Sequence, residues 1–253
     1  MLDKQLVFFP DREVMSTPGD AGLVYEDVTF TASDGVKLHG WFVPGDGKRV
    51  IIWFHGNAGN IGHRVENLVL MREQLRVSVF LFDYRGYGNS EGAPSEQGLY
   101  LDAEAALEYT KTRTGLEADE GIVYFGRSLG AAVAVELATR YPPRALVLES
   151  PFTSIQGMAQ KLHPVVSKIV PLGLVVQSRF DALAKIGQVR TPVMVLHGDQ
   201  DDIIPIEMGR ELFEAANEPK AFYAIRGASH NDTYAVGGVP YFDALRAFVN
   251  RTD

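Results

Sequence analysis

The chain has 253 residues, no cysteine and a formal net charge of −8 at pH 7. The missing cysteine excludes disulfides, thiolate metal sites and a thiol nucleophile, and the acidic balance disfavours binding to nucleic acid or to an anionic membrane surface. The length fits one domain, 1–253, that can bury a sizeable core. The sequence shows no signal peptide and no apolar run long enough to span a bilayer.

The first 43 residues predict an arm followed by a β-hairpin. Residues 1–23 are rich in Pro, Gly and Asp, which indicates an irregular arm, and the apolar residues 6–9 are expected to pack on the domain. From residue 24 onward apolar and polar residues alternate on both sides of Ser33-Asp34-Gly35. Asp-Gly favours a tight hairpin turn, so we expect two strands, 24–30 and 36–43.

Strands and helices then alternate along the chain. Six apolar runs predict buried strands, at 49–54, 77–82, 122–125, 145–150, 193–197 and 221–225. Helices are expected between or after them, at 62–75, 95–113, 131–138, 206–216 and 239–250. Because fully apolar strands alternate with helices, we expect an α/β fold with a mostly parallel, twisted sheet of about eight strands flanked by helices.

Residues 151–189 interrupt this alternation. They contain Pro151, Pro164 and Pro171 between short apolar pieces. Long connections in compact domains are often functional, so we predict a small helical cap inserted after strand 145–150, which is the sixth strand when the two hairpin strands are counted. The alternative is an ordinary connecting helix with extra turns.

The most informative stretch lies between residues 122 and 138. An apolar strand ends in Gly126-Arg127-Ser128-Leu129-Gly130, and an Ala-rich, strongly helix-forming segment follows. Strand, G-x-S-x-G and helix in this order are typical of a nucleophile elbow, in which a strained turn exposes the serine hydroxyl. We therefore predict Ser128 as the nucleophile, with Gly126 and Gly130 allowing strand and helix to approach closely.

A serine nucleophile needs a base, and His230 is the best placed histidine. Ligands of an open parallel sheet bind beyond the carboxyl ends of its strands, and only His230 lies in the loop after the last predicted strand. His55 and His197 end strands beside glycines, where a buried histidine bonded to the backbone is expected. The remaining histidines lie in the hairpin, at the head of a helix and in the cap: His39, His63 and His163.

The acid is expected in the loop after strand 193–197, which contains Asp199, Asp201 and Asp202. Its role is to accept the imidazole N–H and to stabilise the cation that forms during catalysis. We favour Asp201, with Asp199 as the alternative. The loop lacks the glycine and terminal glutamate of a calcium-binding loop, so we expect no metal, and nothing in the sequence indicates a cofactor.

Two main-chain N–H groups are predicted to form the oxyanion hole. One belongs to Leu129, directly after the nucleophile, and the other to Asn57 in the loop after strand 49–54. A phosphate-binding role for this Gly/Asn-rich loop is disfavoured, because it has neither the lysine of a P-loop nor G-x-G-x-x-G spacing.

Five successive motifs resemble signatures of the α/β-hydrolase superfamily: His55-Gly56-Asn57-Ala58-Gly59, Asp83-Tyr84-Arg85-Gly86-Tyr87-Gly88, the elbow, His197-Gly198-Asp199-Gln200-Asp201 and Gly227-Ala228-Ser229-His230. The sequence looks most similar to α/β-hydrolase-domain proteins that include membrane-associated acyl-protein and lipid hydrolases. The resemblance covers the chain from about residue 23 onward. In that family the pattern His-Gly-x-x-Asp ends in the catalytic acid, which implies Asp201, and the resemblance implies that Asp83 and Arg85 brace a turn.

These residues together predict a serine hydrolase that cleaves a carboxylic ester or thioester through an acyl-enzyme. The apolar cap favours a small-molecule or acylated substrate with a hydrophobic part. A peptidase of the same clan and a non-catalytic binding protein on the same fold are the alternatives, whereas dehalogenase- and epoxide hydrolase-like chemistry would require an aspartate in place of Ser128. We expect a cytoplasmic protein or one peripheral to a membrane, with membrane association only if the native N-terminus is longer.

Overall fold

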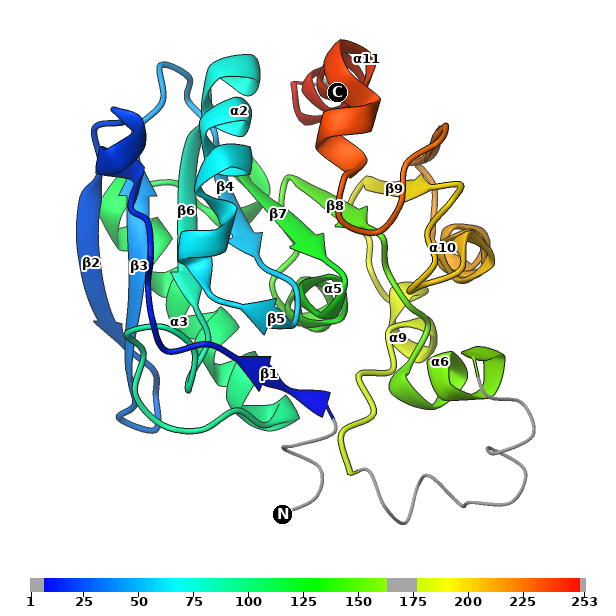
Figure 1. The fold of residues 1–253 in the computed structure, drawn as a ribbon, viewed down its shortest axis with the longest axis horizontal. Helices are drawn as coiled ribbons and strands as arrows, with labels where there is room; N and C mark the ends of the chain where they lie inside the picture. The colour runs from blue at the N-terminus through cyan, green and yellow to red at the C-terminus, as the bar shows by residue number, and fades with distance from the viewer. Residues whose placement is uncertain (1–6, 163–176, 251–253) are drawn as a thin grey trace.

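A computed structural model describes residues 7–162 and 177–250, built around an eight-stranded sheet (Figure 1). The order across the sheet is β10-β9-β8-β7-β4-β6-β3-β2. The strands are β2 (Glu26–Thr31), β3 (Lys37–Val43), β4 (Val50–Phe54), β6 (Ser78–Asp83), β7 (Ile122–Arg127), β8 (Ala145–Glu149), β9 (Val193–Gly198) and β10 (Lys220–Ile225). Of these eight strands, β3 alone runs opposite to the rest, so its pairs with β2 and β6 are antiparallel and all other pairs are parallel, which confirms the mostly parallel sheet.

Burial explains the sequence pattern of each strand. The central strands β4, β6, β7 and β8 are buried at every residue, so their interiors are apolar and polar residues occur only at the ends of β6, β7 and β8. The edge strand β2 alternates between exposed and buried residues, because only one of its faces packs on the core. The expected hairpin of β2 and β3 is present, with Phe30 opposite Leu38.

Helices cover both faces of the sheet (Figure 1). One core cluster joins the sheet to α3 (Glu96–Thr114), α5 (Leu129–Arg140), α9 (Leu183–Ile186) and α10 (Ile206–Ala215). A second cluster joins the other face to α2 (Val65–Leu75) and α11 (Thr233–Val249). Helices therefore cover the sheet on both faces, as the alternation of strands and helices predicts.

The structure differs from the sequence prediction in several short elements. The helix expected at 62–75 is split into a 3-10 turn, η2 (Ile61–Arg64), and α2, because the Asn60 side chain accepts the Gly62 N–H and begins the tighter turn. Four short elements were not predicted: η1 (Pro18–Ala21), α4 (Ala118–Gly121), and the parallel pair of β1 (Phe9–Pro10) and β5 (Ala58–Gly59).

The last helix begins at Thr233, earlier than the predicted start near residue 239. A kink at Gly238, with φ 51° and ψ −143°, divides it into two helical parts. The first part is hard to recognise in the sequence, because the Gly and Pro residues of this segment disfavour a helix. The earlier start places the first turn of α11 directly after the loop that carries His230.

The predicted cap is described only in part. Helices α6 (Ile155–Leu162) and α9 lie within 151–189, whereas residues 163–176, with Pro164 and Pro171, lie outside the described residues. The cap as a whole stays a prediction. Among the residues that the structure describes, no helix has the length and apolar character needed to cross a membrane.

Candidate active site

Ser128 sits at the junction of β7 and α5 in a strained conformation. Its φ of 53° and ψ of −116° lie in a region that non-glycine residues rarely adopt. The Ser128 N–H donates to the Glu149 carbonyl at 2.9 Å, which ties the turn to β8. The turn therefore has the geometry of the predicted elbow and leaves the half-buried Ser128 at the N-terminus of α5.

The two glycines of the elbow are required by close packing. A Cβ at Gly126 would lie 2.5 Å from the Gly130 carbonyl oxygen, and a Cβ at Gly130 would lie 2.0 Å from that of Phe54. Neither position can hold a side chain without displacing backbone. The steric reason that the sequence suggested for both glycines is confirmed.

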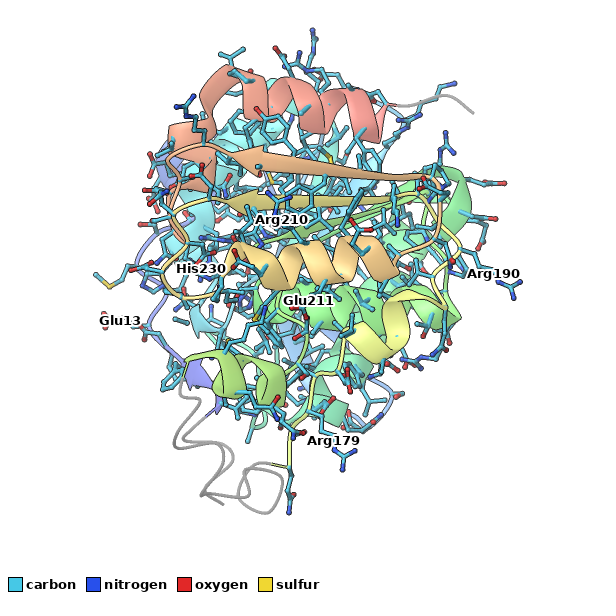
Figure 2. All side chains as sticks on the ribbon, turned by 90° about the vertical axis from the view of Figure 1, so that its right-hand side faces the viewer. Glu13, Arg179, Arg190, Arg210, Glu211 and His230 are labelled. Atoms are coloured by element: carbon cyan, nitrogen blue, oxygen red, sulfur yellow. The ribbon has the colours of Figure 1, made fainter. Side chains whose placement is uncertain are left out.

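His230 lies beyond the carboxyl end of β10 (Figure 2). Its imidazole meets Asp201, which lies beyond the carboxyl end of β9. The Nδ1 of His230 lies 2.8 Å from Oδ2 of Asp201, and the His197 Nε2 lies 3.3 Å from the same oxygen. The other carboxylate oxygen accepts the main-chain N–H groups of Ile203 at 3.0 Å and Ile204 at 2.7 Å. Since a carboxylate only accepts, Nδ1 of His230 donates, and its Nε2 lone pair is left to receive a proton.

The contacts of Asp201 keep it ionised. Burial of the carboxylate acts to raise the pKa of Asp201, but the hydrogen bonds from His197 and His230 outweigh burial and lower the pKa below its usual value. Asp199, the alternative acid, instead accepts the Gly227 N–H at 2.7 Å. The structure thus brings Asp201, the preferred residue, to His230.

The loop after β4 lies beside Ser128. A Cβ at Gly56 would lie 3.6 Å from the Ser128 Cβ. The next residue, Asn57, is held by its side chain, which accepts from the Phe9 N–H at 3.1 Å and the Tyr87 hydroxyl at 2.9 Å. Leu129 is the first residue of α5, so its N–H has no acceptor within the helix. Both predicted oxyanion donors are therefore beside the elbow.

One cavity of about 730 Å³ brings these residues together. Ser128, Leu129, Asn57 and His230 line it, and Asp201 lies behind this lining, bonded to His230. Most of the other lining is apolar: Val7, Phe9, Phe152, Ile155, Met158, Ala159, Ile203 and Ile204. The volume is typical of a site for a small molecule.

Comparison with known proteins identifies the family. A family model described as "Serine aminopeptidase, S33" matches residues 45–182. The chain belongs to this α/β-hydrolase family. An uncharacterised protein of Mycobacterium tuberculosis is 39% identical over 98% of this chain and 88% of its own length. The α/β-hydrolase domain-containing protein WAV2 of Arabidopsis thaliana is 38% identical over 98% of this chain and 87% of its own length.

The solved structures show the same fold. An esterase of Pyrococcus furiosus superposes with a TM-score of 0.80 and 22% identity, covering 97% of this chain and 98% of that one. At this identity the similarity establishes the α/β-hydrolase fold alone, which agrees with the resemblance seen in the sequence motifs.

The hydrolase also contains a buried ion pair that sequence reasoning missed. Arg127, inside the elbow motif, has its Nε 3.1 Å from the fully buried Glu149, and its Nη2 donates to the His230 carbonyl at 2.5 Å. Glu149 also accepts from Thr233 at 3.0 Å and Tyr241 at 2.5 Å on α11. The pair therefore holds the His230 loop against the elbow. The sequence offered one signal of this pair: Arg127 and Glu149 are charged residues that end otherwise apolar strands.

His55 and Asp83 form a second buried pair next to the loop after β4. His55 Nδ1 bonds the Gly56 carbonyl at 2.7 Å, which confirms the expected backbone role, and His197 likewise bonds the Ile204 carbonyl at 2.8 Å. Asp83 accepts the Ile61 N–H at 3.0 Å and lies 3.5 Å from His55. Burial lowers the pKa of His55 to about 3 and raises that of Asp83 to about 8, so both side chains are uncharged at neutral pH.

Asp83 is expected to make the hydrolase less stable as pH rises. The folded protein keeps the Asp83 proton until about pH 8, whereas the unfolded chain releases it near its ordinary pKa of about 4. The resulting stabilisation is complete below pH 4 and is lost as pH rises through 8. Relative to Asp83→Asn, the wild type should lose free energy of unfolding between about pH 5 and 8. Urea unfolding of both proteins across this range tests it, and a difference that does not change with pH would refute it.

Proposed function

We propose that the protein is a serine hydrolase that cleaves carboxylic esters or thioesters through an acyl-enzyme. The observation that carries this proposal is the arrangement at the cavity. Ser128 occupies a strained elbow on the same cavity as His230, and His230 is hydrogen-bonded to Asp201 at 2.8 Å. A nucleophile, a base and a residue that orients the base are the groups that acyl transfer requires.

Each residue has one role in the proposed reaction. Ser128 attacks the carbonyl carbon while His230 takes its proton, and Asp201 keeps the imidazole in the required tautomer and stabilises its cation. The N–H groups of Asn57 and Leu129 bind the developing oxyanion. His230 then returns the proton to the leaving alcohol or thiol, and water cleaves the acyl-enzyme to release the acid.

The cavity lining supports a substrate with a hydrophobic part. Phe9 and Ile203 line the cavity and are 56% and 44% exposed, so apolar surface is available for contact with a ligand. Covering such surface is favourable. We expect the acyl chain to supply this contact, and we expect the protein in the cytoplasm or peripheral to a membrane.

A series of p-nitrophenyl esters and matched thioesters of increasing acyl length tests the proposal. We expect turnover, with kcat/KM rising about fourfold for each added methylene until the cavity is filled, because a buried methylene contributes about 0.8 kcal/mol. Amino-acid p-nitroanilides test the peptidase alternative that the family description suggests. Turnover of the anilides but of none of the esters would contradict the proposal.

A further inference from the structure

Arg64, at the end of η2, is a cation on the cavity wall that lacks a counter-ion. It lines the same cavity as Ser128 and His230 and is half-buried. Its Nη2 donates to the Ala58 carbonyl at 2.5 Å, while its Nε is buried without a partner. Within 7–162 and 177–250, no carboxylate forms an ion pair with Arg64. By contrast, His63 lies 3.9 Å from a carboxylate oxygen of Asp11, and Arg72 lies 3.1 Å from one of Asp46. A buried charge without a partner is costly.

The surroundings of Arg64 add to this cost. Burial and then the charge of Arg127 lower the pKa of Arg64 to about 10, so the guanidinium is still charged at neutral pH. The buried carboxyl that would favour the cation is Asp83, but its pKa is raised to about 8 and it is largely protonated at neutral pH. Arg127 has Glu149 as its counter-ion, and Arg64 has no equivalent among the described residues.

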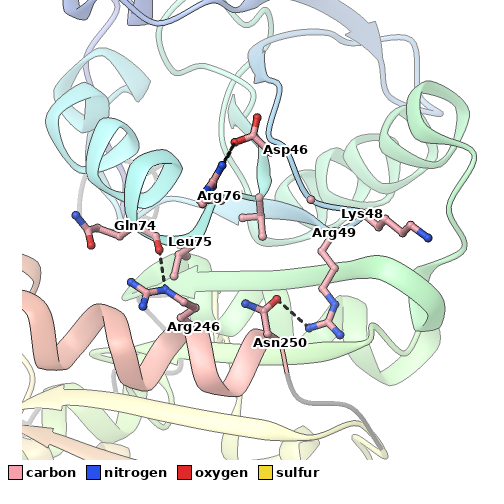
Figure 3. Close-up of a pocket in the computed structure, with 10 residues that line it drawn as sticks. Asp46, Lys48, Arg49, Gln74, Leu75, Arg76, Arg246 and Asn250 are labelled. Atoms are coloured by element: carbon pink, nitrogen blue, oxygen red, sulfur yellow. Dashed lines mark hydrogen bonds and ion pairs between the residues drawn. The ribbon is translucent and has the colours of Figure 1, made fainter.

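A second cavity, of about 510 Å³, shows how this protein neutralises arginines elsewhere (Figure 3). Arg76 pairs with Asp46 at 3.2 Å, and Arg246 donates to the Gln74 carbonyl at 2.8 Å and pairs with Asp243 at 2.9 Å. These arginines are satisfied within the protein. Among the described residues, no carboxylate lies beside Arg64 in this way.

The cavity has an apolar end and a basic end. Residues of α6 form the apolar end, and the exposed Arg179, whose carbonyl accepts the Ile155 N–H, also lines the cavity there. The basic end contains Arg64, which precedes α2, and Arg127, whose Nη2 also lies 3.2 Å from Asn231 before α11. Figure 1 shows α6 on one side of the elbow and α2 and α11 on the other. A carbonyl bound at Ser128 would therefore have its two substituents in opposite environments.

We propose that the substrate joins a hydrophobic acyl group to an alcohol or thiol part that carries an anionic group, such as a carboxylate or phosphate, and that Arg64 binds this group. The planar guanidinium matches the oxygens of these anions, and charge-assisted hydrogen bonds are stronger than neutral ones. The acyl chain occupies the apolar end, so the leaving group faces the basic end. This inference rests on the proposed serine hydrolase function.

Esters that differ only in one charge test this proposal. The two substrates are 4-carboxyphenyl butyrate and 4-carbamoylphenyl butyrate, which have the same acyl group and similar shape. We expect kcat/KM of the wild type to favour the carboxylate at least about tenfold, and we expect this ratio to fall to about one in Arg64→Gln. Arg64→Lys should keep part of the preference, since it keeps the charge but not the planar geometry.

The matched control is Arg76→Gln, which removes the same charge at the second cavity and should leave the ratio unchanged. A wild type without preference, or an Arg64→Gln variant that keeps it, would overturn the proposal. An equal preference for a carboxylate on the acyl part, tested with p-nitrophenyl hydrogen glutarate against its methyl ester, would also overturn it. Failure of the serine hydrolase function itself is distinguishable, because neither butyrate would then be turned over.

Discussion

Replacing Ser128 with alanine is expected to reduce kcat for p-nitrophenyl butyrate by at least about 10⁴-fold, because the variant lacks the hydroxyl that forms the acyl-enzyme. The fold should be unaffected. The Ser128 side chain makes no capping hydrogen bond at the start of α5, and alanine has the same Cβ as serine, so the strain of the turn is unchanged. Kinetics and thermal unfolding of the same preparation measure both expectations.

Ser150→Ala is the matched control for this variant. Ser150 also has a positive φ, 45°, is buried and follows the strand next to β7, but it does not line the cavity. It should retain wild-type turnover. If Ser128→Ala hydrolysed the ester as fast as the wild type, or if Ser150→Ala lost as much activity, Ser128 would not be the nucleophile.

Replacing Asp201 with asparagine is expected to reduce kcat by about 10⁴-fold. An amide of the same shape places either a donor opposite His230 Nδ1 or a neutral oxygen in place of an anion. The first forces the wrong tautomer, and the second removes the charge that stabilises the imidazolium. The hydrogen bonds that the carboxylate accepts from His197 and from the N–H groups of Ile203 and Ile204 fix its orientation, so it is not free to turn away from His230.

Asp199→Asn separates the two candidate acids. Its carboxylate accepts the Gly227 N–H, and asparagine keeps an oxygen for this bond, so activity should change by less than about threefold. Steady-state kcat of the two variants decides between them. A large loss in Asp199→Asn with a small loss in Asp201→Asn would transfer the role of the acid to Asp199.

The sequence predicted the parts of the fold that have strong local signals. Apolar runs such as β4 and residues 122–125 of β7 are recognisable because burial on both faces leaves no polar positions within them. The elbow was recognisable because Gly126 and Gly130 are required by close backbone contacts. Two-residue strands such as β1 and β5 have no such pattern, since their pairing depends on residues far apart in the chain.

The site was predictable up to the point where tertiary contacts decide. Two aspartates within one turn, Asp199 and Asp201, cannot be distinguished by spacing, and the structure separates them by directing one to Gly227 and the other to His230. Arg64, Arg127 and Glu149 come from three segments that meet only because β4, β7 and β8 are neighbours in the sheet. No pattern along the sequence reports that proximity.

The most direct test of the central claim, that Ser128, His230 and Asp201 form one catalytic unit, is labelling with a fluorophosphonate followed by peptide mass spectrometry. The probe reacts with a serine that a neighbouring base activates. We predict labelling of the wild type at Ser128 alone, and a rate that falls strongly in His230→Ala. No labelling, labelling at another residue, or an unchanged rate in His230→Ala would contradict the account.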